Sequence, residues 1–244
     1  MDALTAQQLL AVWETGQDQS PAERALALLT AACPTVSPET LAELSIGRRD
    51  ARLLRLREWA FGSQLAGVAD CPQCGERSEM RFAVDDIRTG GELDPPEPLS
   101  LDVEDYELSF RLPNSSDLMA APRGGDRNAI KQALVERCVL QAGHQGAEIK
   151  AAQLPDNVIA AISRRMAVAD PQADIQLALD CPACGRGWQA RFDIVSFFWR
   201  EIGAWAGRVL REVHILASAY GWREDDILAM SPWRRQIYLE MVGA

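Results

Sequence analysis

The chain has 244 residues, of which 48% are hydrophobic and 25% are charged, which is ordinary for a globular protein that buries a substantial core. Its 35 acidic and 25 basic residues give a formal net charge of −10, and this balance disfavours nucleic acid as the main partner, because phosphate binding needs concentrated Lys and Arg. No apolar run approaches the roughly 18 residues of a membrane span, and the N-terminus lacks the pattern of a secretory signal. We therefore expect a cytoplasmic protein without a membrane partner.

The N-terminal region, residues 1–62, carries the signals of several helices. Apolar side chains recur at helical spacing in residues 5–14, and a further helix is expected to end at Gly62. Two Ser-Pro dipeptides mark other helix starts, since serine caps the free amides and proline suits the first helical position. These dipeptides are Ser20-Pro21 and Ser37-Pro38. The region is predicted to be helical throughout.

Residues 63–89 are predicted to form a β-hairpin with the sequence CPQCG at its tip, because apolar and polar residues alternate on either side of that turn. Residues 90–101, which are rich in proline, glycine and acidic residues, form the best candidate linker. Region 102–171 is predicted to contain one strand followed by helices. The strand is indicated by alternating apolar residues, namely Tyr106, Leu108, Phe110 and Leu112.

Residues 172–195 repeat the first hairpin, with CPACG at the tip. The first cysteines of the two turns are 110 positions apart, and an Arg-Phe pair follows each turn at the same distance. This similarity suggests a diverged internal duplication. Residues 196–244 are predicted to be helical, with one long amphipathic helix that ends near Gly221 and two short helices after it. The predicted fold is α+β and predominantly helical, with two CPxCG zinc-knuckle hairpins that meet in one zinc-ribbon-like core.

Each CPxCG turn presents two thiolates, which is half of the set that a structural zinc ion requires. The economical interpretation is that both turns share one structural zinc per chain. The predicted ligands are Cys71, Cys74, Cys181 and Cys184. One alternative is a redox CxxC pair, although such a pair normally opens a helix, and another is that the turns no longer bind metal. The two remaining cysteines, Cys33 and Cys138, fit buried apolar positions.

Candidate partner-binding residues are found at two places. One is an arginine cluster that includes Arg48, Arg49 and Arg52, which is either a solvated helix face or a grip for an acidic partner or a nucleic-acid backbone. The other is Trp233 with Arg234, placed after a Ser-Pro turn, which either belongs to the core or anchors a partner. Because the sequence has no GxSxG, GxxxxGK[ST] or HExxH motif, we expect a binding protein and not an enzyme.

The order of several segments is similar to that of a known family. The segments are IGRRDARLLRLRE (46–58), CPQCG, MAVADPQADIQLALDCP (166–182), CPACG and REVHILASAYGWREDDILAMSPWRRQIYLEMV (211–242). Together they resemble the baseplate hub assembly chaperones of contractile phage tails and of related bacterial contractile injection systems. The resemblance implies a non-enzymatic role in building the baseplate hub, with baseplate or hub proteins as partners. The zinc prediction rests on cysteine spacing and not on this resemblance.

The leading hypothesis is therefore a zinc-stabilised assembly chaperone or scaffold, and its closest competitor is a permanent baseplate component. Two hypotheses from other classes are a zinc-ribbon regulator that binds nucleic acid through residues 48–57 and a thiol-disulfide enzyme. Neither the oligomeric state nor the identity of the partner follows from the sequence.

Overall fold

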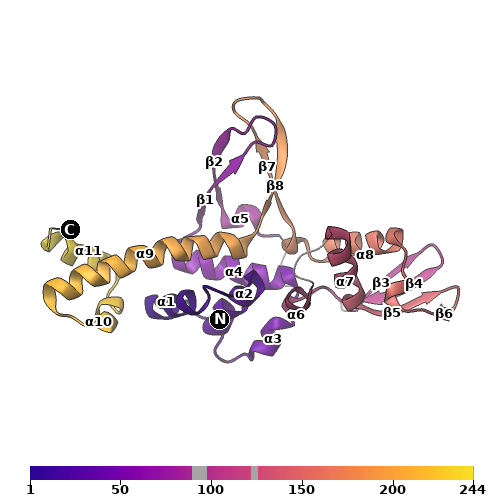
Figure 1. The fold of residues 1–244 in the computed structure, drawn as a ribbon, viewed down its shortest axis with the longest axis horizontal. Coiled ribbons are helices and arrows are strands. Elements are labelled where there is room, and N and C mark those ends of the chain that lie inside the picture. Colours follow the sequence, from indigo (N-terminus) through magenta and orange to yellow (C-terminus); the bar gives the residue numbers. More distant parts are fainter. Residues whose placement is uncertain (90–97, 122–125, 244) are drawn as a thin grey trace.

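The computed structural model describes residues 1–89, 98–121 and 126–243. A central helical body carries two β-hairpins that stand on it side by side, a mixed sheet-and-helix lobe extends from one end, and a helical lobe extends from the other (Figure 1). Residues 90–97 of the predicted linker lie outside the described residues, and its last residues belong to a strand that begins at Leu99.

Four N-terminal helices form most of the body. They are α1 (Ala6–Thr15), α2 (Pro21–Ala32), α3 (Pro38–Ala42) and α4 (Ile46–Phe61). The Ser-Pro starts are confirmed: Ser20 and Ser37 each accept a hydrogen bond from a backbone amide of the first turn, and Ser20 forms a reciprocal capping box with Glu23. Helix α4 ends at Gly62, whose φ of 87° lies in the region that glycine tolerates best.

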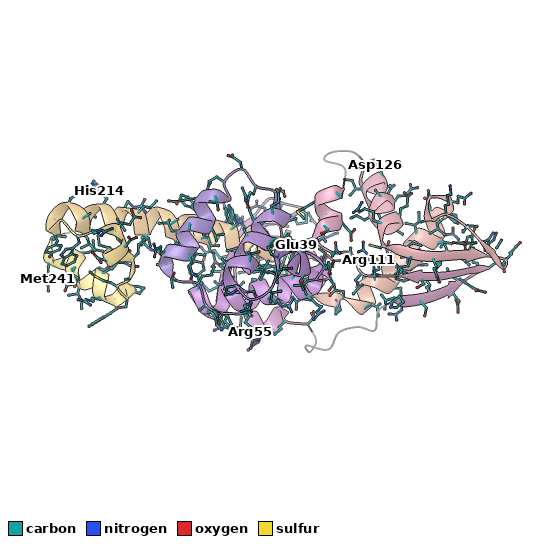
Figure 2. The ribbon with its side chains drawn as sticks, turned by 90° about the horizontal axis from the view of Figure 1, so that it is seen from below. Glu39, Arg55, Arg111, Asp126, His214 and Met241 are labelled. Atoms are coloured by element: carbon teal, nitrogen blue, oxygen red, sulfur yellow. The ribbon has the colours of Figure 1, made fainter. Side chains whose placement is uncertain are left out.

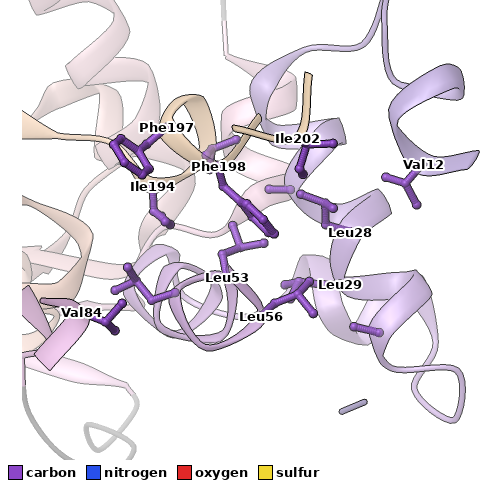
Figure 3. Close-up of a cluster of buried hydrophobic side chains, with 14 of the residues drawn as sticks. Val12, Leu28, Leu29, Leu53, Leu56, Val84, Ile194, Phe197, Phe198 and Ile202 are labelled. Atoms are coloured by element: carbon purple, nitrogen blue, oxygen red, sulfur yellow. The ribbon is translucent and has the colours of Figure 1, made fainter. Parts of the chain in front are cut away.

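The core of the body is formed where α2, α4 and the first half of the long helix α9 (Ile194–Tyr220) meet (Figure 3). Leu28, Leu53 and Phe198 are fully buried there. The roots of the two hairpins enter the same core through Leu65 in the first and Ile175 in the second. The hairpins are therefore held at their base by apolar packing against the helices.

Two antiparallel hairpins are formed, as the alternation predicts. They consist of β1 (Gln64–Asp70) with β2 (Arg77–Ala83), and β7 (Ile175–Asp180) with β8 (Gly187–Phe192). The short helix α5 (Val84–Ile87) follows the first hairpin, and α9 follows the second. The register is the same in both: Leu65 pairs with Phe82, and 110 positions later Ile175 pairs with Phe192.

The sheet lobe contains three more strands than the sequence indicated. Its four strands lie in the order β3 (Leu99–Val103), β4 (Tyr106–Phe110), β5 (Val139–His144) and β6 (Ala147–Glu148). The helices of this lobe are α6 (Ser115–Ala120), α7 (Arg127–Cys138) and α8 (Asp156–Ala169), with short 3₁₀ turns at Ala151–Gln153 and Pro171–Ala173. Phe110, Val158 and Ile162 are fully buried in the core between sheet and helices. The expectation of a single strand was wrong: β3 begins inside the segment interpreted as a linker, and β5 follows α7 directly and lacks a clean alternation.

The C-terminal lobe is built on the second half of α9, with α10 (Glu224–Leu228) and α11 (Pro232–Met241) folded back against it. Val209, Leu216 and Ile227 form its separate small core. Gly221 ends α9 in the left-handed conformation, with a φ of 68°. Among the described residues, no helix combines the length and the apolar character needed to cross a bilayer.

The sheet lobe is joined to the body at the start of α4. The backbone N–H of Gly47 donates to the Asp170 carboxylate at 2.8 Å in a buried environment. A side chain at position 47 would overlap with that carboxylate, so the contact depends on glycine. The N–H of Ile46 donates to the carbonyl oxygen of Pro113 at 3.1 Å, which adds a second link between the two parts.

Candidate metal centre

The tips of the two hairpins bring four cysteines together. In the first turn, the N–H of Cys71 donates to the Glu76 carbonyl oxygen and the N–H of Gly75 donates to the Cys71 carbonyl oxygen, both at 2.9 Å. The second turn has the same two bonds at the same distances, from Cys181 to Arg186 and from Gly185 to Cys181. The two turns thus have the same pattern of backbone hydrogen bonds.

Glycine is required after the second cysteine of each turn. Gly75 and Gly185 have φ angles of 75° and 71°, which place both in the left-handed region that other residues enter at a cost of about 1 kcal/mol or more. The glycine lets the chain turn back into the second strand immediately after the cysteine. Each pair of sulfurs is thereby presented at the end of a rigid hairpin.

The sulfur geometry fits a tetrahedral metal ion. The Sγ atoms of Cys71 and Cys184 are 3.7 Å apart, those of Cys74 and Cys181 are 3.6 Å apart, and all four lie within 4.8 Å of one another. A tetrahedron of sulfurs at about 2.3 Å from zinc has edges of about 3.8 Å. Both of the short pairs join one hairpin to the other, so an ion at the centre would bind each half of the chain to its counterpart.

The two thiols of the first turn differ in their pKa values. Hydrogen bonds from the backbone amides of Cys74 and Gln73 lower the pKa of Cys71 to about 6, against the effect of burial. For Cys74, the amide of Glu76 favours the thiolate, but hydrogen bonds with the other thiols and burial outweigh it and raise the pKa to about 12. Cys71 is thus ready to ionise, whereas Cys74 needs a nearby positive charge, and a cation at the centre would supply that charge.

Neither CxxC pair opens a helix. Each first cysteine directly follows a strand, turn residues come next, and a second strand follows the turn. The redox alternative therefore lacks the helix N-terminus that activates such thiols in disulfide enzymes. Cys33 and Cys138 are both buried and lie apart from the cluster, as the sequence suggested.

The predicted arginine cluster lies on α4 and is largely engaged inside the protein. Arg49 is buried, with an ion pair to Asp50 at 2.7 Å and a long hydrogen bond to Ser115 at 3.5 Å. Arg57 is also buried and forms a bidentate ion pair with Glu201 of α9, in which two guanidinium nitrogens donate to the two carboxylate oxygens at 2.6 and 2.8 Å. For these two residues the interpretation as a solvated helix face was wrong, since both side chains are buried, and the partner of Arg57 is 144 residues away in the sequence. Arg48 and Arg52 are half-buried on the same helix.

Trp233 and Arg234 lie in α11, away from the arginines of α4. The side chain of Trp233 is 75% exposed, and Arg234 is exposed with its guanidinium over the ring of Tyr238 at 5.8 Å. Figure 2 shows that Arg55, which lies on α4, and Met241, which lies on α11, are in different parts of the molecule. The two predicted partner-binding places are therefore not parts of one surface.

Two of the buried carboxylates have shifted pKa values, and the sequence did not indicate either of them. Burial raises the pKa of Asp50 to about 6, although Arg49 opposes this. Burial would also raise the pKa of Asp117, but hydrogen bonds from Arg111 and Asn114 hold it below its usual range. No local motif marks either residue, because the folded chain brings their surroundings together from distant segments.

One comparison with known proteins gives a match. A sequence model for the family described as T4 bacteriophage base plate protein matches residues 4–199. The match includes the body helices α1 to α4, both hairpins with all four cysteines, and the sheet lobe. No curated protein and no solved structure matches the chain.

Proposed function

The chain belongs to the T4 bacteriophage base plate protein family, and we propose that it is a non-enzymatic chaperone or scaffold for assembling the baseplate hub of a contractile injection particle. Its partners are then baseplate or hub proteins of the same particle, which it meets in the cytoplasm. Family membership carries this proposal, since the matched residues make up most of the chain.

We further propose that Cys71, Cys74, Cys181 and Cys184 hold one structural zinc ion per chain. The sulfur spacing and the matched turns support this. Four thiolates leave no open coordination position, so the ion would contribute stability and not catalysis. Binding energies on the order of 10 kcal/mol are typical of structural zinc, and here that energy would hold the hairpins together.

The helix α11 is the strongest candidate for contact with a hub protein. Trp233, Ile237 and Met241 recur every four residues, and Trp233 and Met241 are 75% and 68% exposed. Large apolar side chains that stay exposed in a row on one helix face suggest a partner that covers them. Arg234 would flank this apolar row. Arg48 and Arg52 on α4 are candidates for a second contact with a partner. Arg49 is not a candidate, because its side chain is buried.

Deleting the gene tests the assembly role. We expect no assembled contractile particles in the deletion strain, as judged by electron microscopy of purified material, and full recovery when the wild-type gene is restored. Normal numbers of intact particles without the gene would rule out a chaperone or scaffold function.

A permanent baseplate component is the second candidate, and the description of the family as a base plate protein favours it. Quantitative mass spectrometry of purified particles separates the two. A released chaperone would be absent or far below the stoichiometry of the other baseplate proteins, whereas a component would be present in a fixed ratio to them.

A further inference from the structure

The two hairpins meet at their cysteine tips and through the rings of Phe82 and Phe192, and the space between them is open at the sides. Alternate residues of the four strands point into this space, yet only Leu65 and Ile175, at the root, are buried. The other inward positions are half-exposed. They are Gly67, Ala69, Ser78, Met80, Phe82, Leu177, Leu179, Trp188, Ala190 and Phe192. A layer of apolar side chains of this size normally has a cover.

One open side is a groove between β1, β8 and the first turns of α9, which we call the α9 groove. Its lining includes Val68, Phe82, Phe192, Phe197 and Arg200. The rings of Phe82 and Phe192 meet edge to face at 5.6 Å, and the ring of Phe197 lies 5.3 Å from that of Phe192. Val68 at the rim is 49% exposed. The groove therefore has an aromatic floor and an apolar rim.

The edge of β1 that faces away from β2 carries unpaired backbone groups. The bonds from Cys71 N–H to Glu76 and from Val84 N–H to Ser63 show which residues pair across the hairpin, because pairing alternates along a strand. By this alternation, the N–H and C=O groups of Ala66 and Val68 point outward. Among the described residues no further strand pairs with β1.

This edge lacks the protection that native sheets usually have. The sequence of β1, QLAGVAD, contains no proline and no lysine, which are the residues that commonly block pairing with another chain. An open edge beside an apolar groove is the arrangement used by proteins that bind an extended peptide as an added strand. The backbone edge would supply affinity, and the groove would accept alternate side chains.

The charges near the root of the groove favour an acidic group on the ligand. Glu201 is already paired with Arg57, and Asp193 accepts hydrogen bonds from the first turn of α9. Arg200 is exposed and donates to the Ser196 carbonyl oxygen, and in the described part of the chain it has no ion pair. One positive charge at this end is therefore available to a partner.

We propose that a partner protein adds an extended segment as a strand along β1, with alternate apolar side chains in the α9 groove and an acidic side chain near Arg200. The identity of that partner, a baseplate hub protein, rests on the proposed function. The chemistry of the segment does not, since it follows from the open edge, the aromatic floor and the unpaired cation.

Two proline variants, at residues that are paired across the first hairpin, test the addition of a strand along β1. Val68 and Glu79 are opposite each other in the register, and the N–H of each points away from the hairpin, toward opposite open sides. Val68→Pro blocks the β1 edge, whereas Glu79→Pro blocks the β2 edge and is the matched control. Both should retain the zinc content of the wild type, because neither removes a hydrogen bond within the hairpin.

The measurement is binding of the purified hub proteins of the same particle to immobilised full-length chain. We expect Val68→Pro to weaken binding by roughly tenfold or more, as the loss of a backbone hydrogen bond and its neighbours implies, and Glu79→Pro to bind like the wild type. Hydrogen exchange gives a readout without mutation: the amides of residues 64–70 should exchange more slowly in the complex than in the free chain.

The other outcomes are distinguishable. If the wild type binds no hub protein, the proposed function fails, and the partner assigned to the groove fails with it. If hub proteins bind but Val68→Pro has no effect, or both prolines act equally, or residues 64–70 exchange as in the free chain, the strand proposal alone is overturned. It is also overturned if the wild type is a dimer that only Val68→Pro dissociates, because a second copy would then occupy the edge.

Discussion

At the scale of single residues, the candidate metal centre depends on four thiols and on the backbone amides around them. Each sulfur lies 3.6 or 3.7 Å from a sulfur of the other hairpin. Four thiols this close resist ionising together, because each thiolate repels the next. A divalent cation removes that obstacle, so metal binding and contact between the hairpins reinforce each other.

Replacing one ligand should abolish tight metal binding. Cys181→Ser is expected to reduce the zinc content from about one ion per chain to near zero, since three thiolates do not complete the tetrahedral set, and to lower the unfolding temperature. Elemental analysis and thermal unfolding measure both effects. Cys33→Ala is the control, because Cys33 is buried in the body core away from the cluster, and it should keep its zinc. A Cys181→Ser protein with a full complement of zinc would contradict the shared site.

The buried Asp50 should make stability depend on pH. Its pKa is raised from 3.8 to about 6 in the folded protein, so the protonated form favours folding. That contribution to the free energy of unfolding is complete below about pH 4 and is lost as the pH rises through 6. A pKa raised by about two units corresponds to a contribution of about 3 kcal/mol.

Asp50→Asn removes this titration. The free energy of unfolding of the wild type should therefore fall by about 3 kcal/mol relative to the variant between pH 4 and pH 7, as measured by urea unfolding of both proteins at each pH. The comparison cancels the effect of pH on metal binding. Parallel pH profiles for the two proteins would show that Asp50 is not the group responsible.

At the scale of elements, the sequence predicted those that depend on local signals. The Ser-Pro caps placed α2 and α3, and the alternation around each CPxCG turn placed both hairpins. Strand β5 was missed because it continues from α7 without a break and gains its place only by pairing with β4. The burial of Arg57 was missed for a similar reason, since its partner Glu201 is 144 residues away. Local structure was therefore predictable, and so was the meeting of the two cysteine turns, because their matched motifs marked both halves. Long-range pairings without such a motif were not predictable.

The junction between body and sheet lobe can be tested through a glycine. Gly47→Ala would push a methyl group into the Asp170 carboxylate and remove its hydrogen bond, so we expect a loss of about 2–4 kcal/mol in the free energy of unfolding. Gly207→Ala is the matched control, because this helical glycine has only the Arg211 side chain near it, at 3.9 Å. It should be neutral or stabilising by up to about 1 kcal/mol. Equal effects of the two changes would contradict the proposed junction.

At the scale of the whole molecule, the chain is an elongated arrangement of a body, a sheet lobe and a C-terminal lobe, with the paired hairpins projecting from the body (Figure 1). The family match ends at residue 199, near the start of α9, so the lobe that carries Trp233 lies outside it.

Trp233→Ala should separate stability from assembly. Because Trp233 is 75% exposed, the free energy of unfolding should change by no more than about 0.5 kcal/mol, while particle assembly in the complemented deletion strain should fall markedly. Val168→Ala is the control, since Val168 of α8 is equally exposed, and it should support normal assembly. Full assembly with Trp233→Ala would remove α11 from the proposed contact surface.

The most direct test of the shared metal centre is X-ray absorption at the zinc edge of the purified wild-type protein. The proposed shared site predicts one zinc ion per chain with four sulfur neighbours at about 2.3 Å and no nitrogen or oxygen ligand. Protein without bound metal, or zinc with only two sulfur neighbours, would contradict it, because each hairpin would then hold its cysteines independently of the other.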